Sequence, residues 1–175
     1  ILPDRGDTMD DISLAKKLLI ERGLSLVIIK GGELLFESKD RGLRPLVRAI
    51  EDKKEEIKGS SLADKVIGRA AAMLIVYGGI KEVYTPLLSD SASSILEAAG
   101  IKYQFERSVP AILTEDKTQI CPLEELSQQF PSPCELFEAL KERLSLSSKL
   151  AIKTAKEGDI DRLVELFRYL ALYHK

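Results

Sequence analysis

The stretch LSLVIIKGGELLF, residues 24–36, decides the predicted fold. It starts with a run of apolar, largely β-branched residues, and Gly31-Gly32 then supplies a turn that tolerates positive φ. Apolar residues resume directly after the glycines, so the stretch predicts a β-hairpin. Apolar residues at helical spacing precede it over residues 10–22, with acidic residues at the amino end and Gly23 just past the last turn.

Strands and helices alternate after this hairpin. Pro45 can open a helix that continues to Ile57. The pattern then predicts a helix rich in small residues over 63–77, a strand over 82–88, a helix over 89–99, a strand over 101–106 and a short edge strand over 109–113. Right-handed crossovers put helices on both faces of such a sheet. We therefore expect an α/β fold, a three-layer α-β-α sandwich around a mixed sheet.

The carboxyl-terminal part of the chain reads as helical. Two prolines break the pattern after Phe130, and a further helix over residues 135–143 completes the compact domain, which is expected to span residues 10–143. Residues 144–175 predict a helical hairpin with a break at Gly158. The hairpin resembles one unit of a helical solenoid, but solenoids need about three or more units. A packing or dimerisation hairpin is favoured, and the dimerisation alternative would make the protein a homo-oligomer.

The composition argues against several classes of function. The 175-residue chain is 45% hydrophobic with a net charge of -2, so it can bury a core but lacks the basic surface of a nucleic-acid groove. No nucleic-acid partner is expected. The longest apolar run, over residues 70–77, is far shorter than the roughly 20 residues that span a bilayer, so no membrane segment is expected. Without a secretory signal pattern, a cytoplasmic protein is expected.

Cysteine and histidine are too few for a zinc site of the usual kind. The chain has Cys121, Cys134 and His174, and the two cysteines read as reduced thiols. His174 lies next to the carboxyl end of the sequence, which makes it a poor candidate for a catalytic base. Neither glycine pair, 31–32 or 78–79, forms a phosphate-binding motif, and no spaced acidic motif points to a metal. We therefore expect neither a metal nor a cofactor.

The expected helix over residues 63–77 carries an unfavourable charge pattern. Asp64, Lys65 and Arg69 fall within its first two turns. Cations near a helix amino terminus oppose the macrodipole, and Lys65 and Arg69 would repel each other at i,i+4 spacing. An anionic partner would reverse both effects. Two partners are open: a carboxylate of the protein itself, either Asp64 or a nearby glutamate, and a bound phosphate or carboxylate.

These residues also carry a family resemblance. The strings DKVIGRAAA (64–72), YGG (77–79), EVY (82–84) and CPLE (121–124), with Ser89, FES (36–38) and GLRPL (42–46), resemble a prokaryotic family of unknown function with a cytidine-deaminase-like fold. The resemblance covers residues 10–143. It implies that two helix amino ends converge at one cleft beside the sheet.

The chain departs from zinc deaminases at both metal-binding motifs. Such enzymes need His/Cys-x-Glu at the start of the helix after the hairpin, and Pro-Cys-x-x-Cys after the third strand. If the helix from Pro45 to Ile57 is an extra helix that precedes the one over residues 63–77, these positions hold residues 64–69 and 89–92, and neither segment contains a histidine or a cysteine. Zinc-dependent deamination is therefore not expected, and whether the protein is an enzyme stays open.

The resemblance nominates residues for the cleft. The ligand-binding candidates are Lys65, Arg69, Ser89, Asp64 and Arg44, and the catalytic candidates, from a Cys-Pro-x-Glu element, are Cys121 and Glu124. The favoured function is binding of a small anionic or nucleotide-like ligand. One alternative is an interaction or oligomerisation role, with the terminal hairpin presenting Phe167, Tyr169 and Tyr173. Another is a thiol-dependent reaction at Cys121, although the favoured interpretation of Cys121 is a small core residue before a helix.

Overall fold

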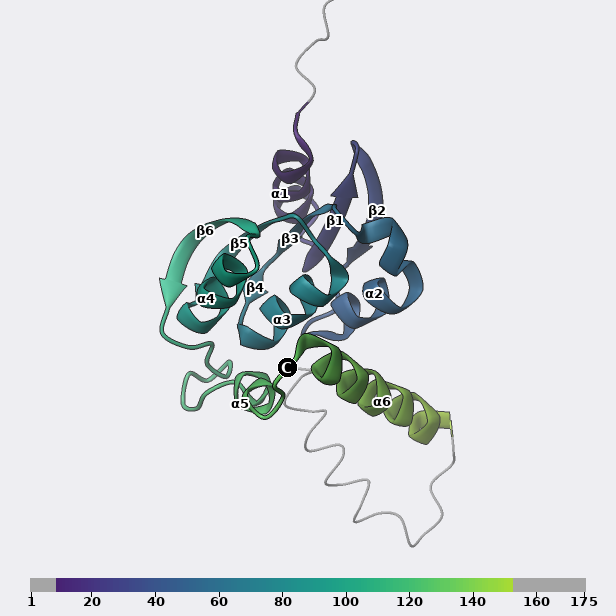
Figure 1. Ribbon diagram of the computed structural model, residues 1–175, viewed down its shortest axis with the longest axis vertical. Coiled ribbons are helices and arrows are strands. Elements are labelled where there is room, and N and C mark those ends of the chain that lie inside the picture. The colour runs from purple at the N-terminus through teal and green to yellow at the C-terminus, as the bar shows by residue number, and fades with distance from the viewer. Residues whose placement is uncertain (1–8, 153–175) are drawn as a thin grey trace, which may run out of the picture.

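The fold is a mixed sheet with helices on both faces, seen here in a computed structural model that describes residues 9–152 (Figure 1). The predicted first helix and the hairpin are both present. In chain order the elements are α1 (Asp11–Glu21), β1 (Leu26–Lys30), β2 (Glu33–Ser38), α2 (Arg44–Ile57), β3 (Ser61–Asp64), β4 (Val66–Ile67), α3 (Arg69–Gly78), β5 (Glu82–Ser89), α4 (Asp90–Ala98), β6 (Lys102–Val109), α5 (Pro122–Gln128) and α6 (Pro133–Ile152).

The sheet combines an antiparallel half with a parallel half. Strand β1 pairs antiparallel with β2 and β3, whereas β5 pairs parallel with β3, β4 and β6. Strands β3 and β4 follow one another along β5 and are separated by Lys65, whose backbone N–H donates to the carbonyl of Ser25 at 3.1 Å. Across the sheet the order is therefore β2, β1, β3 with β4, β5 and β6.

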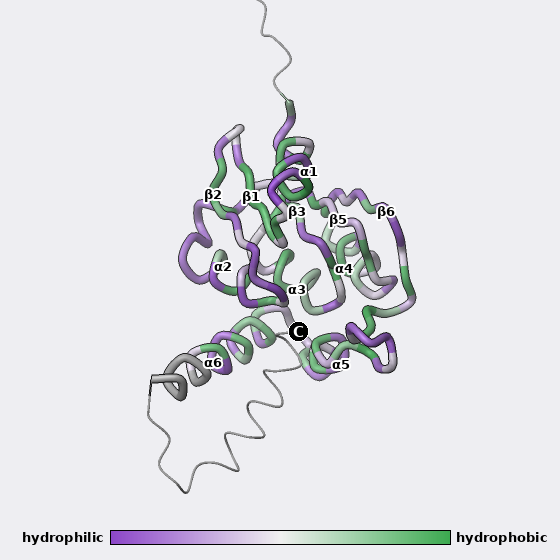
Figure 2. Tube along the Cα trace, turned by 180° about the vertical axis from the view of Figure 1, so that it is seen from behind, coloured by the Kyte–Doolittle hydropathy of each residue, from purple (hydrophilic) through white to green (hydrophobic). Residues whose placement is uncertain are grey.

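Alternate residues of the central strands enter two separate cores. On one face, Val27, Ile29 and Tyr84 pack against the buried side of α1. On the other face, Leu26 and Ile28 pack with apolar residues of α2, α3 and α4, and α5 and α6 add further apolar residues to this larger core. These two cores make three layers, as predicted, and the two views in Figures 1 and 2 show α1 on the face opposite α3.

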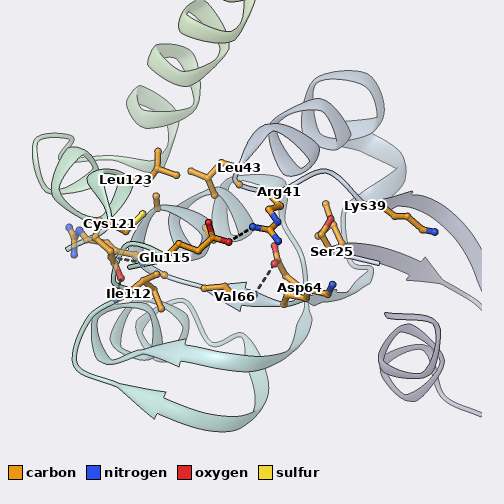
Figure 3. A pocket seen from close by; sticks show the side chains of 18 residues that line it. Ser25, Lys39, Arg41, Leu43, Asp64, Val66, Ile112, Glu115, Cys121 and Leu123 are labelled. Carbon is orange, nitrogen blue, oxygen red and sulfur yellow. Dashed lines mark hydrogen bonds and ion pairs between the residues drawn. The ribbon is translucent and has the colours of Figure 1, made fainter. Parts of the chain in front are cut away.

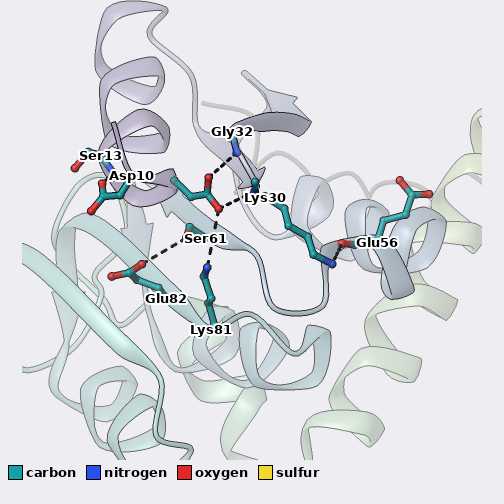
Figure 4. A network of polar contacts seen from close by, with 10 residues as sticks. Asp10, Ser13, Lys30, Gly32, Glu56, Ser61, Lys81 and Glu82 are labelled. Carbon is teal, nitrogen blue, oxygen red and sulfur yellow. Dashed lines mark hydrogen bonds and ion pairs between the residues drawn. The ribbon is translucent and has the colours of Figure 1, made fainter. Parts of the chain in front are cut away.

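Asp11 ties the start of α1 to the turn of the hairpin. Its carboxylate accepts hydrogen bonds from the backbone N–H groups of Gly31 at 2.8 Å and Gly32 at 2.7 Å. Both glycines have positive φ, 61° and 79°, which lets this turn present two adjacent N–H groups to one side chain. Figure 4 shows Gly32 and Lys81 converging on the same carboxylate, with the Lys81 Nζ at 4.0 Å.

The helix predicted over residues 63–77 starts later, at Arg69. Residues 61–64 and 66–67 are strands, because Leu62 and Ala63 fill the buried centre of the sheet between β1 and β5. Pairing on both sides stabilises an extended backbone here despite the helical spacing of the apolar residues. Gly68 is the N-cap of α3.

Two predictions for the second half of the chain also need correction. The short edge strand expected over residues 109–113 is absent from the described structure: β6 is longer and ends at Val109, and Leu113 forms one isolated bridge with Ile120. Pro110, which has no backbone N–H to donate, follows the end of β6.

Helix α6 continues without a break from Pro133 to Ile152, so no separate helix starts after Ser145. The boundary between residues 143 and 144 stays a prediction, and α6 crosses it. The second helix of the predicted hairpin, with Phe167, Tyr169 and Tyr173, lies outside the described residues. Within residues 9–152, no helix is both long and apolar enough to span a membrane.

Candidate ligand-binding site

A cavity of about 400 Å³ lies beside the sheet between the starts of α2 and α3 (Figure 3). Strands β1, β3 and β4 contribute to one side, and the segment from Ile112 to Leu123 contributes to the other. The charged side chains that line the cavity are Lys39, Arg41, Lys65 and Arg69, with Asp64, Glu115 and Glu124. The cavity therefore brings together four cations and three carboxylates from four separate segments of the chain.

Glu124 occupies the amino end of α3. Its Oε2 accepts a 2.8 Å hydrogen bond from the backbone N–H of Arg69, and its Oε1 accepts one from the N–H of Ile112 at 3.3 Å. The side chain is buried, with only 4% of the residue exposed. A carboxylate at this position complements the positive end of the helix. Of the anionic partners left open by the sequence, the structure shows a glutamate of the protein at this helix end.

Gly68 allows this close approach. A Cβ atom at that position would lie 2.9 Å from Oε1 of Glu124 and 3.0 Å from Cγ1 of Ile112. Any larger residue would force the carboxylate or the Ile112 side chain to move. The glycine is therefore required by the contact between α3 and the segment that carries Glu124.

Arg69 and Lys65 both line the cavity, but they are not neighbours on one helix. Lys65 separates β3 from β4, and its Nζ lies 3.4 Å from the carbonyl of Gly23. Arg69 is the first residue of α3, and its Nε is buried without a hydrogen-bond partner among the described residues. The predicted i,i+4 repulsion is therefore wrong, because the chain between the two cations is extended.

Asp64 lines the cavity at the end of β3. Its Oδ1 accepts a hydrogen bond from the backbone N–H of Val66 at 3.1 Å. Burial raises the pKa of Asp64 to about 7, and the hydrogen bond from Val66 opposes this effect only in part. The carboxyl group can therefore be neutral or ionised near neutral pH.

Arg41 and Glu115 form an ion pair across the cavity, as Figure 3 shows. They lie 74 residues apart in the sequence and were not predicted as site residues. Glu115 belongs to a tight turn, in which Thr114 bonds both Asp116 and the backbone of Gln119. No local pattern could have paired these residues, because the fold alone brings the turn opposite Arg41.

Two of the predicted ligand-binding residues lie outside this cavity. Arg44 lines a smaller cavity of about 120 Å³ between α2 and α6, together with Arg48 and Lys141. Ser89 is the buried N-cap of α4, where its Oγ accepts a hydrogen bond from Ala92 N–H at 3.2 Å. Asp64, Lys65, Arg69, Cys121 and Glu124 are brought together as expected.

In the observed topology, the two positions that correspond to the deaminase zinc motifs lie earlier in the chain than predicted. The helix that follows the hairpin is α2, which begins at Arg44, and the helix that follows the third strand is α3, which begins at Arg69. The prediction that the motif positions hold residues 64–69 and 89–92 is therefore wrong, since each position belongs to the preceding helix. The segments now concerned, 41–45 and 68–71, contain no histidine or cysteine either.

The side chains around the cavity do not fit a catalytic zinc ion. Zinc is held by imidazole, thiolate or carboxylate groups, usually three from the protein. Cys121 is the one thiol that lines the cavity, and Glu124 is already bound by the N–H groups of Arg69 and Ile112. Within the described part of the chain, no three His, Cys, Asp or Glu side chains are grouped so that they could hold a metal.

Known structures that resemble this chain include a protein of unknown function. The structure of a DUF1893 family protein from Thermotoga maritima has a TM-score of 0.70 and 25% identity, and the match covers 82% of this chain and 97% of that one. Curated protein sequences gave no match.

Two deaminases are also among the similar structures. The dCMP deaminase of cyanophage S-TIM5 has a TM-score of 0.41 and 16% identity, over 54% of this chain and 93% of that one. A diaminohydroxyphosphoribosylaminopyrimidine deaminase/5-amino-6-(5-phosphoribosylamino)uracil reductase from Thermotoga maritima has a TM-score of 0.39 and 18% identity. This match covers 68% of this chain and 36% of that one.

The family model described as TM1506, a domain of unknown function (DUF1893), matches residues 14–144. This match spans most of the chain, including α2, α3 and the segment that carries Cys121 and Glu124. The prokaryotic family of unknown function expected from the sequence is thus confirmed, and the chain belongs to the DUF1893 family.

Proposed function

We propose that this protein binds a small anionic, nucleotide-like ligand in the cavity between α2 and α3, without zinc-dependent deamination. The observation that carries the proposal is the Nε of Arg69, which is buried at the cavity with no hydrogen-bond partner in the described structure. A buried N–H donor without an acceptor is costly, and an anionic ligand would supply the acceptor.

The size and lining of the cavity support this proposal. Small-molecule sites commonly have volumes of roughly 300 to 1,000 Å³, and about 400 Å³ falls in this range. Leu26, Leu43 and Leu123 provide apolar surface, while Arg41 and Arg69 provide guanidinium groups on separate elements. Such a mixture suits a ligand that has both a flat apolar part and a phosphate or carboxylate group.

Asp64 gives the cavity a group that can change its charge. Below a pH of about 7 its carboxyl is mostly neutral, so it does not repel an anion and can donate a hydrogen bond. Above that pH the carboxylate can accept hydrogen bonds from N–H groups. Heterocyclic ligands with adjacent N–H and carbonyl groups fit both states, which favours a nucleotide-like ligand over a simple anion.

A thermal-shift screen with inorganic phosphate, nucleotides, nucleobases and small carboxylates tests the proposal. A ligand at 100 times its Kd adds about 2.7 kcal/mol of stability, which corresponds to a Tm increase of about 5 to 11 °C. The Lys65→Gln/Arg69→Gln variant should lose this increase. The Lys17→Gln/Arg48→Gln variant removes two exposed cations that do not line the cavity, and it should keep the increase. No shift with any compound would contradict the proposal.

Cys121 supports a second candidate function, a thiol-dependent reaction. Its side chain lines the cavity and is partly exposed, whereas Cys134 is exposed but does not line it. A thiol beside a bound ligand is in a position to act as a nucleophile. Cys121 is also the N-cap of α5, and its backbone N–H donates to the carbonyl of Ile112 at 2.8 Å.

A further inference from the structure

Strand β6 forms an exposed edge of the sheet. It pairs with β5 along one side, and among residues 9–152 no strand pairs with its other side. Six of its eight residues are exposed, and Phe105 is 46% exposed. The strand lies at the outer margin of the molecule in both Figure 1 and Figure 2. An exposed strand of this length offers its free N–H and carbonyl groups to another strand.

The sequence of β6 is complementary to itself when two copies run antiparallel about Gln104. Lys102 then lies opposite Glu106, and this charge pair occurs twice because of the two-fold symmetry. Tyr103 lies opposite Phe105, which adds two aromatic pairs on the other face of the sheet. Opposite charges and aromatic pairs directly across two strands stabilise their association.

Other pairings fit less well. Moving the register by one residue in one direction places Lys102 opposite Arg107, which sets like charges against each other twice. Moving it in the other direction places Lys102 opposite Phe105, so the Lys102–Glu106 pairs are lost. Strand β2 lies at the opposite edge of the sheet. If two copies of β2 pair antiparallel about Leu35, Glu33 of each copy lies opposite Glu37 of the other. Charge complementarity therefore selects β6 over β2, and one register of β6 over its neighbour.

We infer that two copies of this chain associate through β6, in an antiparallel pair centred on Gln104, so that the two sheets become one continuous sheet. The ring of Phe105, which packs against Tyr103 in its own strand with the ring centroids 6.1 Å apart, then also lies beside Tyr103 of the second copy. The strands that contribute to the cavity are β1, β3 and β4, and β5 separates them from β6, so the new contact does not use them. It does not depend on ligand binding.

Sedimentation of the full chain tests the oligomeric state. The wild-type protein should sediment as a dimer, and Lys102→Glu should weaken dimerisation by about tenfold or more, because it places two glutamates opposite each other at two positions. Lys17→Glu, an equal charge reversal on the exposed surface of α1, should leave the dimer unchanged. A wild-type protein that is monomeric at every concentration would overturn the inference.

Cross-linking tests the register. In a Cys121→Ser/Cys134→Ser background, Gln104→Cys should form a disulfide-linked dimer on oxidation, since residue 104 faces itself across the two-fold axis. Ser108→Cys, exposed on the same strand, should not, because its counterpart lies several residues away. A dimer that resists Lys102→Glu and forms no Gln104→Cys disulfide would place the interface elsewhere and refute the inference.

Discussion

Glu124 and Arg69 are 55 residues apart in the sequence, yet Oε2 of Glu124 accepts a 2.8 Å hydrogen bond from the backbone N–H of Arg69. Helix α3 starts after Gly68, which has no side chain to accept the first free N–H groups. Glu124 supplies that acceptor from α5. The contact joins the start of the central helix α3 to the start of α5.

Replacing Glu124 by Gln should destabilise the protein. The Gln amide retains one oxygen but turns an NH₂ group toward either Arg69 N–H or Ile112 N–H, so one donor loses its acceptor along with the charge. We expect the free energy of unfolding in urea to fall by about 1 to 3 kcal/mol. Glu125→Gln, at the exposed neighbouring position, should change it by less than about 0.5 kcal/mol. Equal effects of both changes would show that the buried contact contributes nothing.

Local patterns predicted the elements that local chemistry specifies. The hairpin followed from β-branched residues around Gly31-Gly32, and the helix predicted over residues 89–99 is α4, with Ser89 as its N-cap. Residues 61–67 were mistaken for helix because their extended state depends on pairing with β1 and β5, which are remote in sequence. Without β3, the strand predicted over residues 82–88 counted as the third strand, which moved the second deaminase motif position to residues 89–92. The first position was misplaced because the helix that starts at Pro45 was treated as an extra element.

The cavity could be predicted only in part, for the same reason. Asp64, Lys65, Arg69, Cys121 and Glu124 belong to strings that resemble the family, and the structure brings them together. Arg41 and Glu115 belong to loops, and nothing in the residues beside them indicates that they meet. The ligand-binding candidates Arg44 and Ser89 do not line this cavity: Arg44 lines the smaller cavity between α2 and α6, and Ser89 is the buried N-cap of α4. Their roles in ligand binding stay predictions.

Asp64 should make the stability of the protein depend on pH. The pKa of Asp64 is about 7 in the folded protein, against an ordinary value of 3.8, which applies to the unfolded chain. Between these two pH values, the folded state holds a proton that the unfolded state has lost. Stability therefore falls as pH rises from 4 to 7, by at most about 1.4 kcal/mol per pH unit. Asp64→Asn should abolish this contribution. Urea unfolding at several pH values measures it, and parallel curves for both proteins would contradict the prediction.

Labelling with iodoacetamide should separate the two cysteines. Cys121 lines the cavity and Cys134 is exposed outside it, so a ligand bound in the cavity should slow the alkylation of Cys121 and leave that of Cys134 unchanged. Mass spectrometry of the two peptides gives both rates from one sample. If Cys121 is alkylated slowly and no faster than Cys134, and the ligand does not change its rate, the thiol-dependent reaction is ruled out.

Glu115 should compete with the ligand for Arg41. The carboxylate of Glu115 pairs with the Arg41 guanidinium across the cavity, so an anionic ligand that binds Arg41 must displace it or accept its repulsion. Glu115→Gln removes the competing charge, and we expect the affinity for inorganic phosphate or a nucleotide to rise by about threefold to tenfold.

Glu37→Gln is the matched control for this change. Glu37 pairs with Arg22 at 2.9 Å in a similarly exposed ion pair, but neither residue lines the cavity. Its removal should leave the affinity unchanged, and both variants should unfold at nearly the wild-type temperature because exposed ion pairs add little stability. If the two variants raise the affinity equally, the effect comes from net charge and Arg41 does not bind the ligand. If wild type binds phosphate and Glu115→Gln binds it no better, Glu115 lies clear of the bound anion.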